Sequence, residues 1–559
     1  MTAHERELAA GLNRGTVASE EGRALSPLTA IYDDNEYRPE DEDCDDLGLP
    51  VDLRVVAVDD ESPCPYRPSV QAANGLAALI VRNSSGDVVS DGHPSLKLLA
   101  LLRAYFYAVQ FSNGEVYLTD RTSYDPPTGG VCRPLLDDHL INRCIARYNR
   151  TFPRAALPNE STVRTALRSL GGEALHALGA PWVRWGRSAD GALWWDSGDD
   201  KFVRVDASGW TVSDSADCWF ARSEAIRPMP LPVTGGSLDA LWDFAPVNEA
   251  DRPLVVAWML AATHPDRETA AGMLYISGPE GSAKSTSADK ITEACGSSVA
   301  RKKFDTRRGD DRDLIVGARA SWVLGLDNLS TLTAEQQDLL CTIVTGHEET
   351  YRVLHTTTAT VTLSVRRPVT LTSIEVPILR PDLISRMVPV TLDALECVIP
   401  EDELAVAWRS AQPRVFGALL DLLVKVLATP RQTSEHMPRL ASLGRLALAA
   451  DLVTGTRTLG RLAEAQTALL GDTVADDPFY DTLARCITCT WRGSASALLA
   501  KMDPDGTLAR QHGRQWPTAK GVSARLKRSR RALELAGWGL AVNHAGHHGQ
   551  VWTITPPLV

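Results

Sequence analysis

Residues 266–395 carry the clearest pattern of apolar and polar positions in the chain. Short strand-like runs, among them residues 273–276 and 321–326, alternate there with segments of helical spacing. A continuous apolar run of this length is typical of a strand buried on both faces of a sheet. Strands that alternate with helices in this way predict an α/β fold, in which helices cover a sheet.

The rest of the chain shows other patterns. Residues 96–109 have helical periodicity, residues 115–119 indicate a short strand, and residues 400–490 are rich in leucine and alanine at helical spacing. Pattern and composition together predict six parts: an acidic flexible tail (1–72), a mixed α/β module (73–175), a tryptophan-rich β module with a linker (176–235), an α/β domain (236–395), a helical domain (396–490) and a basic domain (491–559).

Length and composition exclude several classes of protein. The 559 residues are 44% hydrophobic and 23% charged, which fits a globular protein of several domains and no fibrous or wholly disordered chain. The longest uncharged apolar run, residues 254–262, is far shorter than the roughly 20 residues that span a bilayer. The first ten residues lack the apolar segment of a signal peptide. We therefore expect a cytoplasmic protein without a membrane partner.

The ten cysteines are scattered along the chain. Cys486 and Cys489 form one C-x-x-C pair, but no second pair completes a zinc site. The pattern favours two cysteines of a helix that lie in a core.

Charge is distributed unevenly between the two ends. Residues 1–62 carry 17 acids and 5 bases, whereas residues 491–559 carry 10 bases and 3 acids. The acidic end is too charged to pack and is expected to be a solvated leader. The basic end indicates a polyanionic partner.

Six tryptophans fall within residues 182–219, together with turn signals at Asp190-Gly191 and Ser208-Gly209. The pattern favours the core of a small β domain. A platform on which nucleic-acid bases stack is the alternative.

A glycine-containing loop lies between the run 273–276 and a helix-like segment, as a phosphate-binding P-loop requires. Consecutive loop amides and a helix N-terminus create a positive concavity for phosphate. Lys284 would reach the β- and γ-phosphates of ATP, and Ser285 would place its hydroxyl on Mg²⁺. Ala283 stands where the pattern has glycine, which is tolerable only if the backbone there does not need a positive φ. The candidate cofactor-binding residues are Gly278, Glu280, Gly281, Ser282, Ala283, Lys284, Ser285 and Thr286.

A second candidate follows the strand-like run 321–326, which ends in Asp327-Asn328. A carboxylate at the C-terminal edge of a strand can hold Mg²⁺ beside a nucleotide. The alternative is an ordinary turn residue. Asn328 can orient a water molecule but cannot accept its proton, so we expect hydrolysis to be slow unless another acid serves.

With these motifs in order, the chain resembles the ATPase half of primase–helicase proteins of bacterial phages and mobile elements. These are related to superfamily-three helicases within the AAA+ ring ATPases. The resemblance covers roughly residues 205–559. It rests on Gly209-Trp210, residues 230–236, the P-loop, residues 326–330, Thr345-Gly346, residues 380–386 and the basic end.

The resemblance implies a role for each matching residue. Asp327 would be the Walker B acid, and Ser373 would be the polar sensor at the end of the central strand, where superfamily-three helicases usually carry asparagine. Arg386 would be the arginine finger offered to a neighbouring subunit's ATP, with Arg380 as the runner-up. An alternative for Arg386 is a local ion pair with Asp382. Residues 345–352, with Arg352, would lie near a hairpin that faces DNA.

The basic end predicts a winged helix. A helix over residues 494–502 and a second over residues 522–536 precede two strand-like runs, 538–543 and 550–555. A solvated basic face that packs against acidic parts is the alternative. The basic residues expected to bind DNA phosphates are Arg525, Lys527, Arg528, Arg530 and Arg531.

These features predict an α/β P-loop NTPase core, followed by a helical segment and a C-terminal winged helix. The function expected from them and from the resemblance is that of an ATP hydrolase that assembles as a homo-oligomeric ring, such as a hexamer. It would use ATP and Mg²⁺ to drive DNA strand separation or translocation in replication of a phage or mobile element. The alternatives are a nucleotide-gated DNA-binding switch that does not unwind, and a defence NTPase that senses foreign nucleic acid.

Overall fold

The computed structural model describes most of the chain from residue 81 onward, and the predicted acidic tail lies outside the described residues. The described residues are 81–82, 88–90, 94–120, 127–136, 138–151, 158–199, 201–222, 226–265, 270–298, 300–303, 311–329, 332–352, 360–374, 376, 379–475, 477–513, 516–544 and 550–557. They form two compact units. The first reaches Trp182 and includes Ala216–Ser223, and the second contains Val183–Ser215 and Glu224–Val559.

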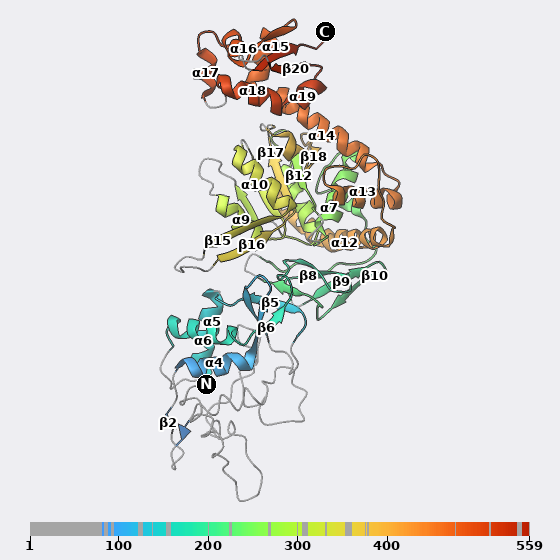
Figure 1. Ribbon diagram of the computed structural model, residues 1–559. Helices are drawn as coiled ribbons and strands as arrows, with labels where there is room; N and C mark the ends of the chain where they lie inside the picture. Colours follow the sequence, from blue (N-terminus) through green and yellow to red (C-terminus); the bar gives the residue numbers. More distant parts are fainter. Residues whose placement is uncertain are drawn as a thin grey trace, which may run out of the picture. The chain divides into compact units, whose positions relative to one another are not determined.

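The first unit contains a mixed five-stranded sheet in the order β11-β5-β4-β3-β6 (Figure 1). Its largest core joins buried residues of α4 and α6 to Phe106 and Leu118 of the sheet. The helix expected over 96–109 ends at Tyr105, because Phe106 begins a strand paired with β4. The elements are β1 (Val81–Arg82), β2 (Val88–Ser90), α4 (Pro94–Tyr105), β3 (Phe106–Phe111), β4 (Val116–Asp120), β5 (Gly130–Pro134), α5 (Asp138–Thr151), α6 (Glu160–Gly171), β6 (Leu175–Ala177) and β11 (Trp219–Ala221).

The second unit begins with an antiparallel sheet in the order β10-β9-β8-β7. Trp185, Trp194 and Trp195 of this sheet are buried, so these indoles form core rather than an exposed stacking platform. The predicted tryptophan-rich segment 176–235 is therefore divided, because its residues up to Trp182 and around β11 belong to the first unit. The strands are β7 (Trp185–Arg187), β8 (Leu193–Asp196), β9 (Phe202–Asp206) and β10 (Gly209–Ser213).

The centre of the second unit is a five-stranded sheet whose neighbouring strands are all parallel, in the order β13-β14-β17-β12-β18. The expected α/β architecture is confirmed. Its elements are η1 (Leu238–Leu241), η2 (Glu249–Asp251), α7 (Arg252–Ala262), β12 (Met273–Ser277), α8 (Lys284–Ala294), β13 (Ala300–Lys303), α9 (Asp311–Ala320), β14 (Leu324–Asp327), α10 (Ala334–Thr345), β15 (His347–Arg352), β16 (Thr360–Val365), β17 (Val369–Ser373), α11 (Pro381–Ile384) and β18 (Met387–Thr391).

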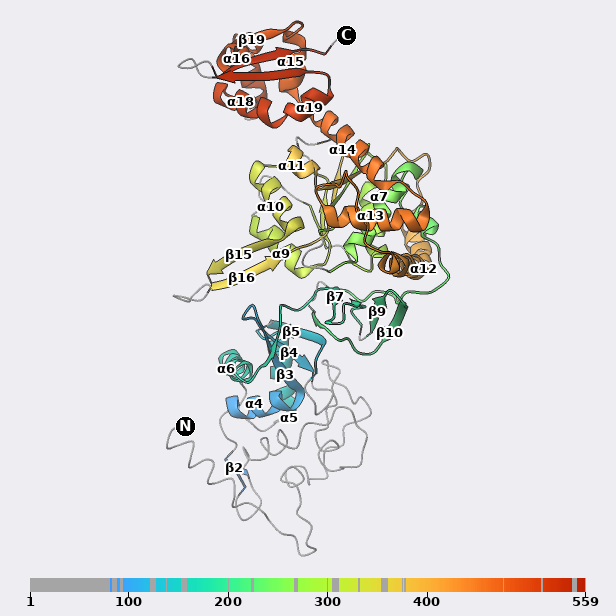
Figure 2. The same ribbon diagram turned by 45° about the vertical axis from the view of Figure 1, so that its right-hand side comes forward.

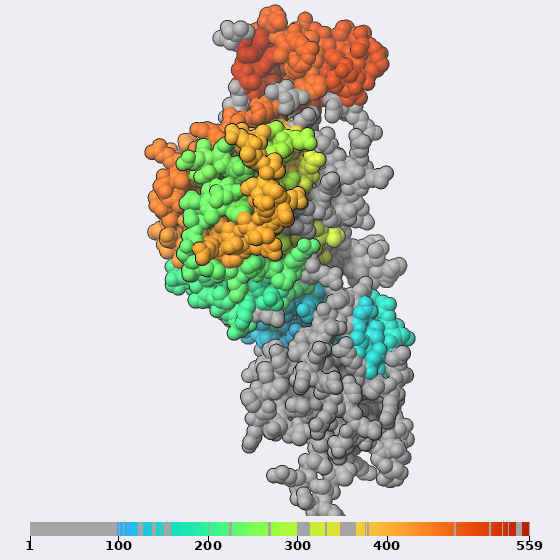
Figure 3. All heavy atoms as spheres, turned by 180° about the vertical axis from the view of Figure 1, so that it is seen from behind, coloured from blue at the N-terminus to red at the C-terminus, as the bar shows by residue number. Residues whose placement is uncertain are grey.

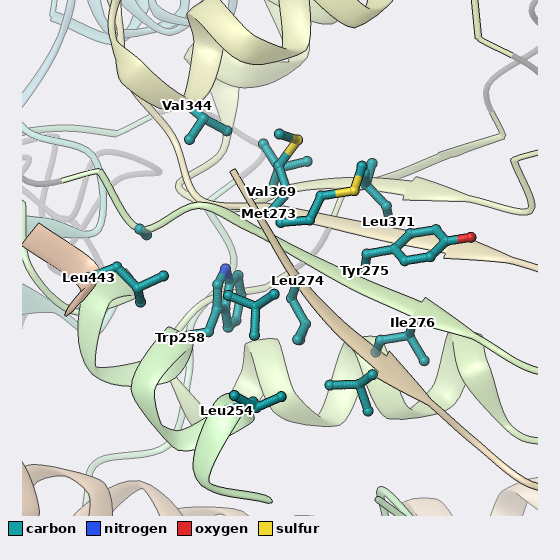
Figure 4. Close-up of a cluster of buried hydrophobic side chains, with 14 of the residues drawn as sticks. Leu254, Trp258, Met273, Leu274, Tyr275, Ile276, Val344, Val369, Leu371 and Leu443 are labelled. Carbon is teal, nitrogen blue, oxygen red and sulfur yellow. The ribbon is translucent and has the colours of Figure 1, made fainter. Parts of the chain in front are cut away.

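Strand β12 lies between β17 and β18 in the sheet, and all five of its residues are buried. Leu274 and Ile276 are fully buried, and Trp258 of α7 lies beside Leu274 (Figure 4). The Trp258 indole donates a hydrogen bond to Gly272 O at 3.2 Å. The loop that follows β12 therefore starts from a rigid strand.

Four helices follow the sheet, as the leucine and alanine spacing of residues 400–490 predicts. They are α12 (Glu401–Ala428), α13 (Ala441–Thr454), α14 (Thr458–Ala475) and α15 (Pro478–Cys486). Helix α13 packs on α7, and Figure 3 shows the orange surface of this region meeting the green one. Helix α14 contacts β18 and, further along, α19 of the C-terminal part.

The C-terminal part combines short helices with a three-stranded antiparallel sheet in the order β19-β21-β20 (Figure 2). The single helix expected over 522–536 is instead two helices, because the chain departs from helical geometry at Ser529. Strand β19 was not predicted. The elements are β19 (Trp491–Ser494), α16 (Ala495–Met502), α17 (Thr507–His512), α18 (Ala519–Arg528), α19 (Arg530–Leu535), β20 (Gly539–His544) and β21 (Gln550–Thr555).

The C-x-x-C pair and the question of a membrane-spanning helix can be compared with the structure. Cys486 ends α15 and is half-buried, but Cys489 is exposed, so the prediction that both cysteines lie in a helical core is wrong for Cys489. Among the helices that the structure describes, none has both the length and the apolar character needed to cross a membrane.

Candidate nucleotide-binding site

The loop between β12 and α8 is shaped by glycine. Gly278 has φ +155°, and a Cβ atom there would lie 2.4 Å from Leu392 O and 2.8 Å from Ser282 Oγ. Gly281 has φ +78°. Ser282 is fully buried, and its Oγ donates to Pro279 O at 2.8 Å. The loop thus curls back on itself directly before the N-terminus of α8.

Ala283 precedes α8 in the left-handed conformation, with φ +57° and ψ +27°. The sequence argument allowed a methyl group here only if the backbone needed no positive φ, and the structure does not meet that condition. An L-residue in this region carries a cost of roughly 1–2 kcal/mol relative to the right-handed conformation. The turn into α8 is therefore strained.

Lys284, the first residue of α8, folds over the loop. Its Nζ donates to Pro279 O at 2.5 Å and to Ser282 Oγ at 3.3 Å. Desolvation lowers the pKa of Lys284, while the nearby carboxylates of Asp327 and Glu280 act in the opposite direction. The ammonium group thus lies within the curl of the loop and within the field of Asp327.

Ser285 joins this loop to the end of β14. Its Oγ donates a hydrogen bond of 2.7 Å to Oδ1 of Asp327. Strand β17 separates β12 from β14, so the contact crosses the C-terminal edge of three neighbouring parallel strands. A hydroxyl and a carboxylate are the hard oxygen ligands that Mg²⁺ prefers, so the donor set fits that ion.

Thr372 was not predicted as a site residue, yet it makes three contacts with the segment after β14. Its Oγ1 donates to Asp327 Oδ1 at 2.5 Å and accepts from the Asn328 amide at 2.9 Å. Its carbonyl accepts from Leu329 N at 2.8 Å. Asn328 itself is exposed and has φ +56°.

Ser373, the predicted sensor, lies next to Thr372 but faces the other side of β17. It is fully buried, and its Oγ is 2.6 Å from the hydroxyl of Tyr275. Burial raises the pKa of Tyr275 to about 12, against a smaller lowering by Ser373. The structure therefore brings Thr372, and not Ser373, to Asp327.

Both candidate finger arginines are paired within the chain. Arg386 Nη1 is 2.9 Å from Asp382 Oδ2, and its side chain is only 11% exposed. Its Nε has no hydrogen-bond partner among the described residues. Arg380 Nη1 lies 2.6 Å from Asp338 Oδ1, with 31% of the Arg380 side chain exposed. The structure thus shows the local ion pair with Asp382 that was the alternative to a finger role for Arg386.

Arg352 ends β15, which pairs with β16 in an antiparallel hairpin. Figures 1 and 2 show this hairpin projecting from the helices beside it. The side chains of the hairpin strands before Val365 lie outside the described part, so the structure gives Arg352 a place in the backbone only.

The basic residues near α18 separate into different environments. Arg525 pairs with the buried Asp477, and its guanidinium lies 5.3 Å from the ring centroid of Phe479 and 5.7 Å from that of Tyr480. Arg525 is therefore mostly shielded from solvent and held by Asp477, unlike an exposed base that could contact DNA. Arg530 pairs with Glu534 at 2.8 Å, Lys527 is exposed, and the side chains of Arg528 and Arg531 are outside the described set.

Lys520 is an exposed basic residue that the sequence reasoning missed. It lies seven residues before Lys527 on α18, and residues at this spacing share a helix face. Val522 and Leu526 on the same helix are fully buried, so the two lysines mark the solvent face. The seven-residue spacing between Lys520 and Lys527 is the sequence feature that could have identified Lys520.

Comparisons with known proteins find a family similarity over two stretches of the second unit. Residues 237–477 match the model of the actinomycete integrative conjugative element replication protein, and residues 479–557 match the AICE RepA C-terminal domain. No curated protein sequence matches the chain.

Two solved structures resemble the chain at low scores. One is the SCCmec type IV Cch active helicase, with 13% identity, a TM-score of 0.35, and coverage of 68% of this chain and 77% of that chain. Another is the apo A form of the NrS-1 C-terminal region, with 8% identity, a TM-score of 0.35, and coverage of 82% and 98%. Scores of this size do not establish a shared fold. The family matches support the expected link to a mobile element, and over these two stretches the chain is similar to the replication protein of actinomycete integrative conjugative elements.

Proposed function

We propose that this protein is an ATP-dependent DNA helicase or translocase with a P-loop NTPase core that acts in replication of a mobile element. The observation that carries the proposal is the 2.7 Å hydrogen bond between Ser285 Oγ and Asp327 Oδ1. It joins a glycine-shaped loop at a helix N-terminus to a carboxylate at the end of another parallel strand. Phosphate and a divalent cation are the ligands that suit these two features together.

Different residues of the site would bind the phosphates and the Mg²⁺ of Mg·ATP. The amides of the loop and the N-terminus of α8 would bind phosphate oxygens, and Lys284 would exchange its contact with Pro279 for the β- and γ-phosphates. Ser285 and Asp327 would hold Mg²⁺, which neutralises charge on the phosphate oxygens when bound.

Hydrolysis needs a group that orients the attacking water. Asn328 is exposed beside Asp327, and its amide can orient water without accepting the proton. We therefore propose a slow basal rate that increases when DNA and a neighbouring subunit complete the site.

A neighbouring subunit would supply a guanidinium to the γ-phosphate, which requires a ring-shaped homo-oligomer such as a hexamer. A positioned arginine of this kind is worth about 10³–10⁵ in rate where it has been measured. Arg380 is the better placed of the two candidates, because it is more exposed than Arg386 and pairs with a carboxylate, Asp338, that is itself exposed. The loss of Arg380 would lower turnover but leave ATP binding intact.

DNA binding is assigned to the C-terminal part, which we propose to be a winged helix. Helices α16 and α18 with the hairpin β20–β21 have its outline, and β19 completes the three-stranded sheet. Lys520 and Lys527 on the exposed face of α18 would contact phosphates, with the hairpin as the wing.

A strand-displacement assay tests the proposal. Wild-type protein should separate a labelled duplex only with Mg²⁺ and ATP, and Lys284→Ala should not. Lys425→Ala, which removes an exposed lysine of α12, is the matched control and should behave as wild type. Equal strand displacement by wild type and Lys284→Ala would refute the proposed site.

A second candidate function is a nucleotide-gated DNA-binding switch that does not unwind. The exposed Asn328, in place of an acid, favours it. In that case ATP would alter DNA affinity in a binding assay, and no strand would be displaced under any condition.

A further inference from the structure

The hydroxyl of Thr372 on β17 hydrogen-bonds the candidate Mg²⁺-binding carboxylate of Asp327. Its Oγ1 donates to Asp327 Oδ1 at 2.5 Å, on the same oxygen that accepts from Ser285 at 2.7 Å. One carboxylate oxygen thus receives two hydroxyl hydrogen bonds, one from the loop side and one from the central strand.

The register of the sheet explains why Thr372 reaches Asp327. Leu326 of β14 is paired in parallel with Leu371 of β17. The next residues along the two strands, Asp327 and Thr372, therefore lie side by side and project to the same face, because side chains alternate along a strand. Ser373, one residue further, projects to the opposite face and bonds Tyr275.

Thr372 also holds the turn that follows Asp327. The Asn328 amide donates to Thr372 Oγ1, and the Leu329 amide donates to Thr372 O. Asn328 has φ +56°, a conformation that costs free energy unless the surroundings enforce it. The two hydrogen bonds supply that constraint. Thr372 thus holds Asp327 in two ways, through its carboxylate and through the backbone that follows it.

We infer that Thr372 is a positioning residue that directs the Asp327 carboxylate toward Ser285 and so sets the affinity of the site for Mg²⁺ in the presence of nucleotide. The inference rests on the proposed nucleotide site. Thr372 acts through Asp327, as a partner of a metal ligand does, and the loss of such a partner typically lowers metal affinity about 10–100-fold.

The test is a Mg²⁺ titration of the binding of a fluorescent ATP analogue to the full chain. In Thr372→Val the concentration of Mg²⁺ at half-saturation should rise about tenfold or more, because the isosteric side chain lacks the hydroxyl. Thr372→Ser keeps the hydroxyl and should return the value to that of wild type. Affinity for the analogue without Mg²⁺ should be the same in all three proteins, because the loop and Lys284 are intact.

Ser373→Ala is the matched control. It removes a buried, hydrogen-bonded hydroxyl from the neighbouring residue of the same strand, but on the face away from Asp327. It should lower thermal stability without changing the Mg²⁺ titration. Thr372→Ala provides a second hydroxyl-free variant if Thr372→Val does not fold.

The outcomes separate this inference from the proposed function. A wild-type protein that binds no ATP analogue refutes the proposed site. Wild-type binding with an unchanged Mg²⁺ titration in a folded Thr372→Val or Thr372→Ala variant refutes only the role of Thr372. A titration shifted equally by Ser373→Ala would also overturn it, because the effect would then follow loss of packing in β17.

Discussion

At the scale of single residues, the loop before α8 stores strain at Ala283. Its φ of +57° belongs to the region that glycine adopts without a steric cost. The methyl group lies at the position from which the amides of the loop and of α8 turn toward the proposed phosphates. The site is therefore built at some expense of stability, as ligand-binding segments often are.

Ala283→Gly should stabilise the second unit. Relief of the left-handed alanine is worth roughly 1–2 kcal/mol, and the greater freedom of glycine in the unfolded chain offsets about 0.4–1 kcal/mol of it. The expected gain is about 0.5–1 kcal/mol, measured as a shift in the urea midpoint. A loss of stability in Ala283→Gly would show that the loop is not strained as described.

Residue identities near Asp327 show what a sequence can and cannot predict. Lys284, Ser285 and Asp327 were predicted from a loop and an apolar strand, since both patterns are local. Thr370, Thr372 and Ser373 all carry hydroxyls in one strand, so the pattern cannot say which one reaches Asp327. That depends on the register with β14, which only the folded sheet provides.

At the scale of elements, α8 is fixed at both ends. It starts at the candidate phosphate loop, and two indoles of the antiparallel sheet hold the turn after its C-terminus. Trp185 Nε1 donates to Cys295 O at 2.9 Å and Trp195 Nε1 donates to Gly296 O at 2.7 Å. Phe416 of α12 packs edge-on against both rings. The tryptophan-rich sheet thus supports the helix that would meet the nucleotide.

Trp195→Phe should destabilise the second unit by about 1–3 kcal/mol, because it leaves the buried Gly296 carbonyl without its donor. Chemical denaturation followed by circular dichroism measures the change. An unaltered denaturation midpoint would mean that the indole hydrogen bond does not contribute to holding α8.

The ion pair between Asp382 of α11 and Arg386, which follows that helix, predicts a dependence on pH. Burial alone would raise the pKa of Asp382, but Arg386 and Arg439 outweigh it and lower the pKa. A carboxyl whose folded-state pKa is lowered stabilises the protein above its unfolded pKa of about 3.9 and loses that contribution as pH falls through the folded value.

Asp382→Asn should therefore lower the thermal midpoint at pH 7, since it removes the charged partner of the mostly buried Arg386. The difference from wild type should shrink as the pH falls below about 4 toward the lowered folded-state pKa, at which the wild-type carboxyl also becomes neutral. A difference that stays constant from pH 7 to pH 3 would argue against an electrostatic role.

At the scale of the whole molecule, the family match spans the sheet domain, the helices and the C-terminal part in sequence. Helix α14 connects them, because it packs on β18 beside β12 and also contacts α19. Gln466 of α14 donates to Met387 O at 2.7 Å, which fixes the helix to the start of β18. A single helix thus joins the candidate nucleotide domain to the candidate DNA-binding part.

The larger architecture was predictable to the extent that its patterns are local. The α/β order, the helical segment and strand β21 follow from periodicity alone. The division of the tryptophan-rich segment between two units and the inward turn of Arg525 could not be predicted. Both depend on partners distant in sequence, such as Cys295 and Asp477.

DNA binding by the C-terminal part predicts a change in salt dependence. Replacement of Lys520 and Lys527 by alanine should weaken DNA binding and reduce the slope of log affinity against log salt by about 1.8, at roughly 0.9 for each phosphate contact. Arg530→Ala, which removes a cation already paired with Glu534, is the comparison variant and should change the slope less. Fluorescence anisotropy with duplex DNA measures both, and an identical slope in the double variant and wild type would exclude this face.

The rate of ATP hydrolysis with and without DNA, in wild type and in Lys284→Ala, tests the central claim most directly. The account predicts a low basal rate in wild type that DNA increases, and no Mg²⁺-dependent hydrolysis in Lys284→Ala under either condition, with both proteins folded to the same extent. Hydrolysis at the wild-type rate by Lys284→Ala would contradict it, because the curl of chain after β12 would then not be where the triphosphate binds.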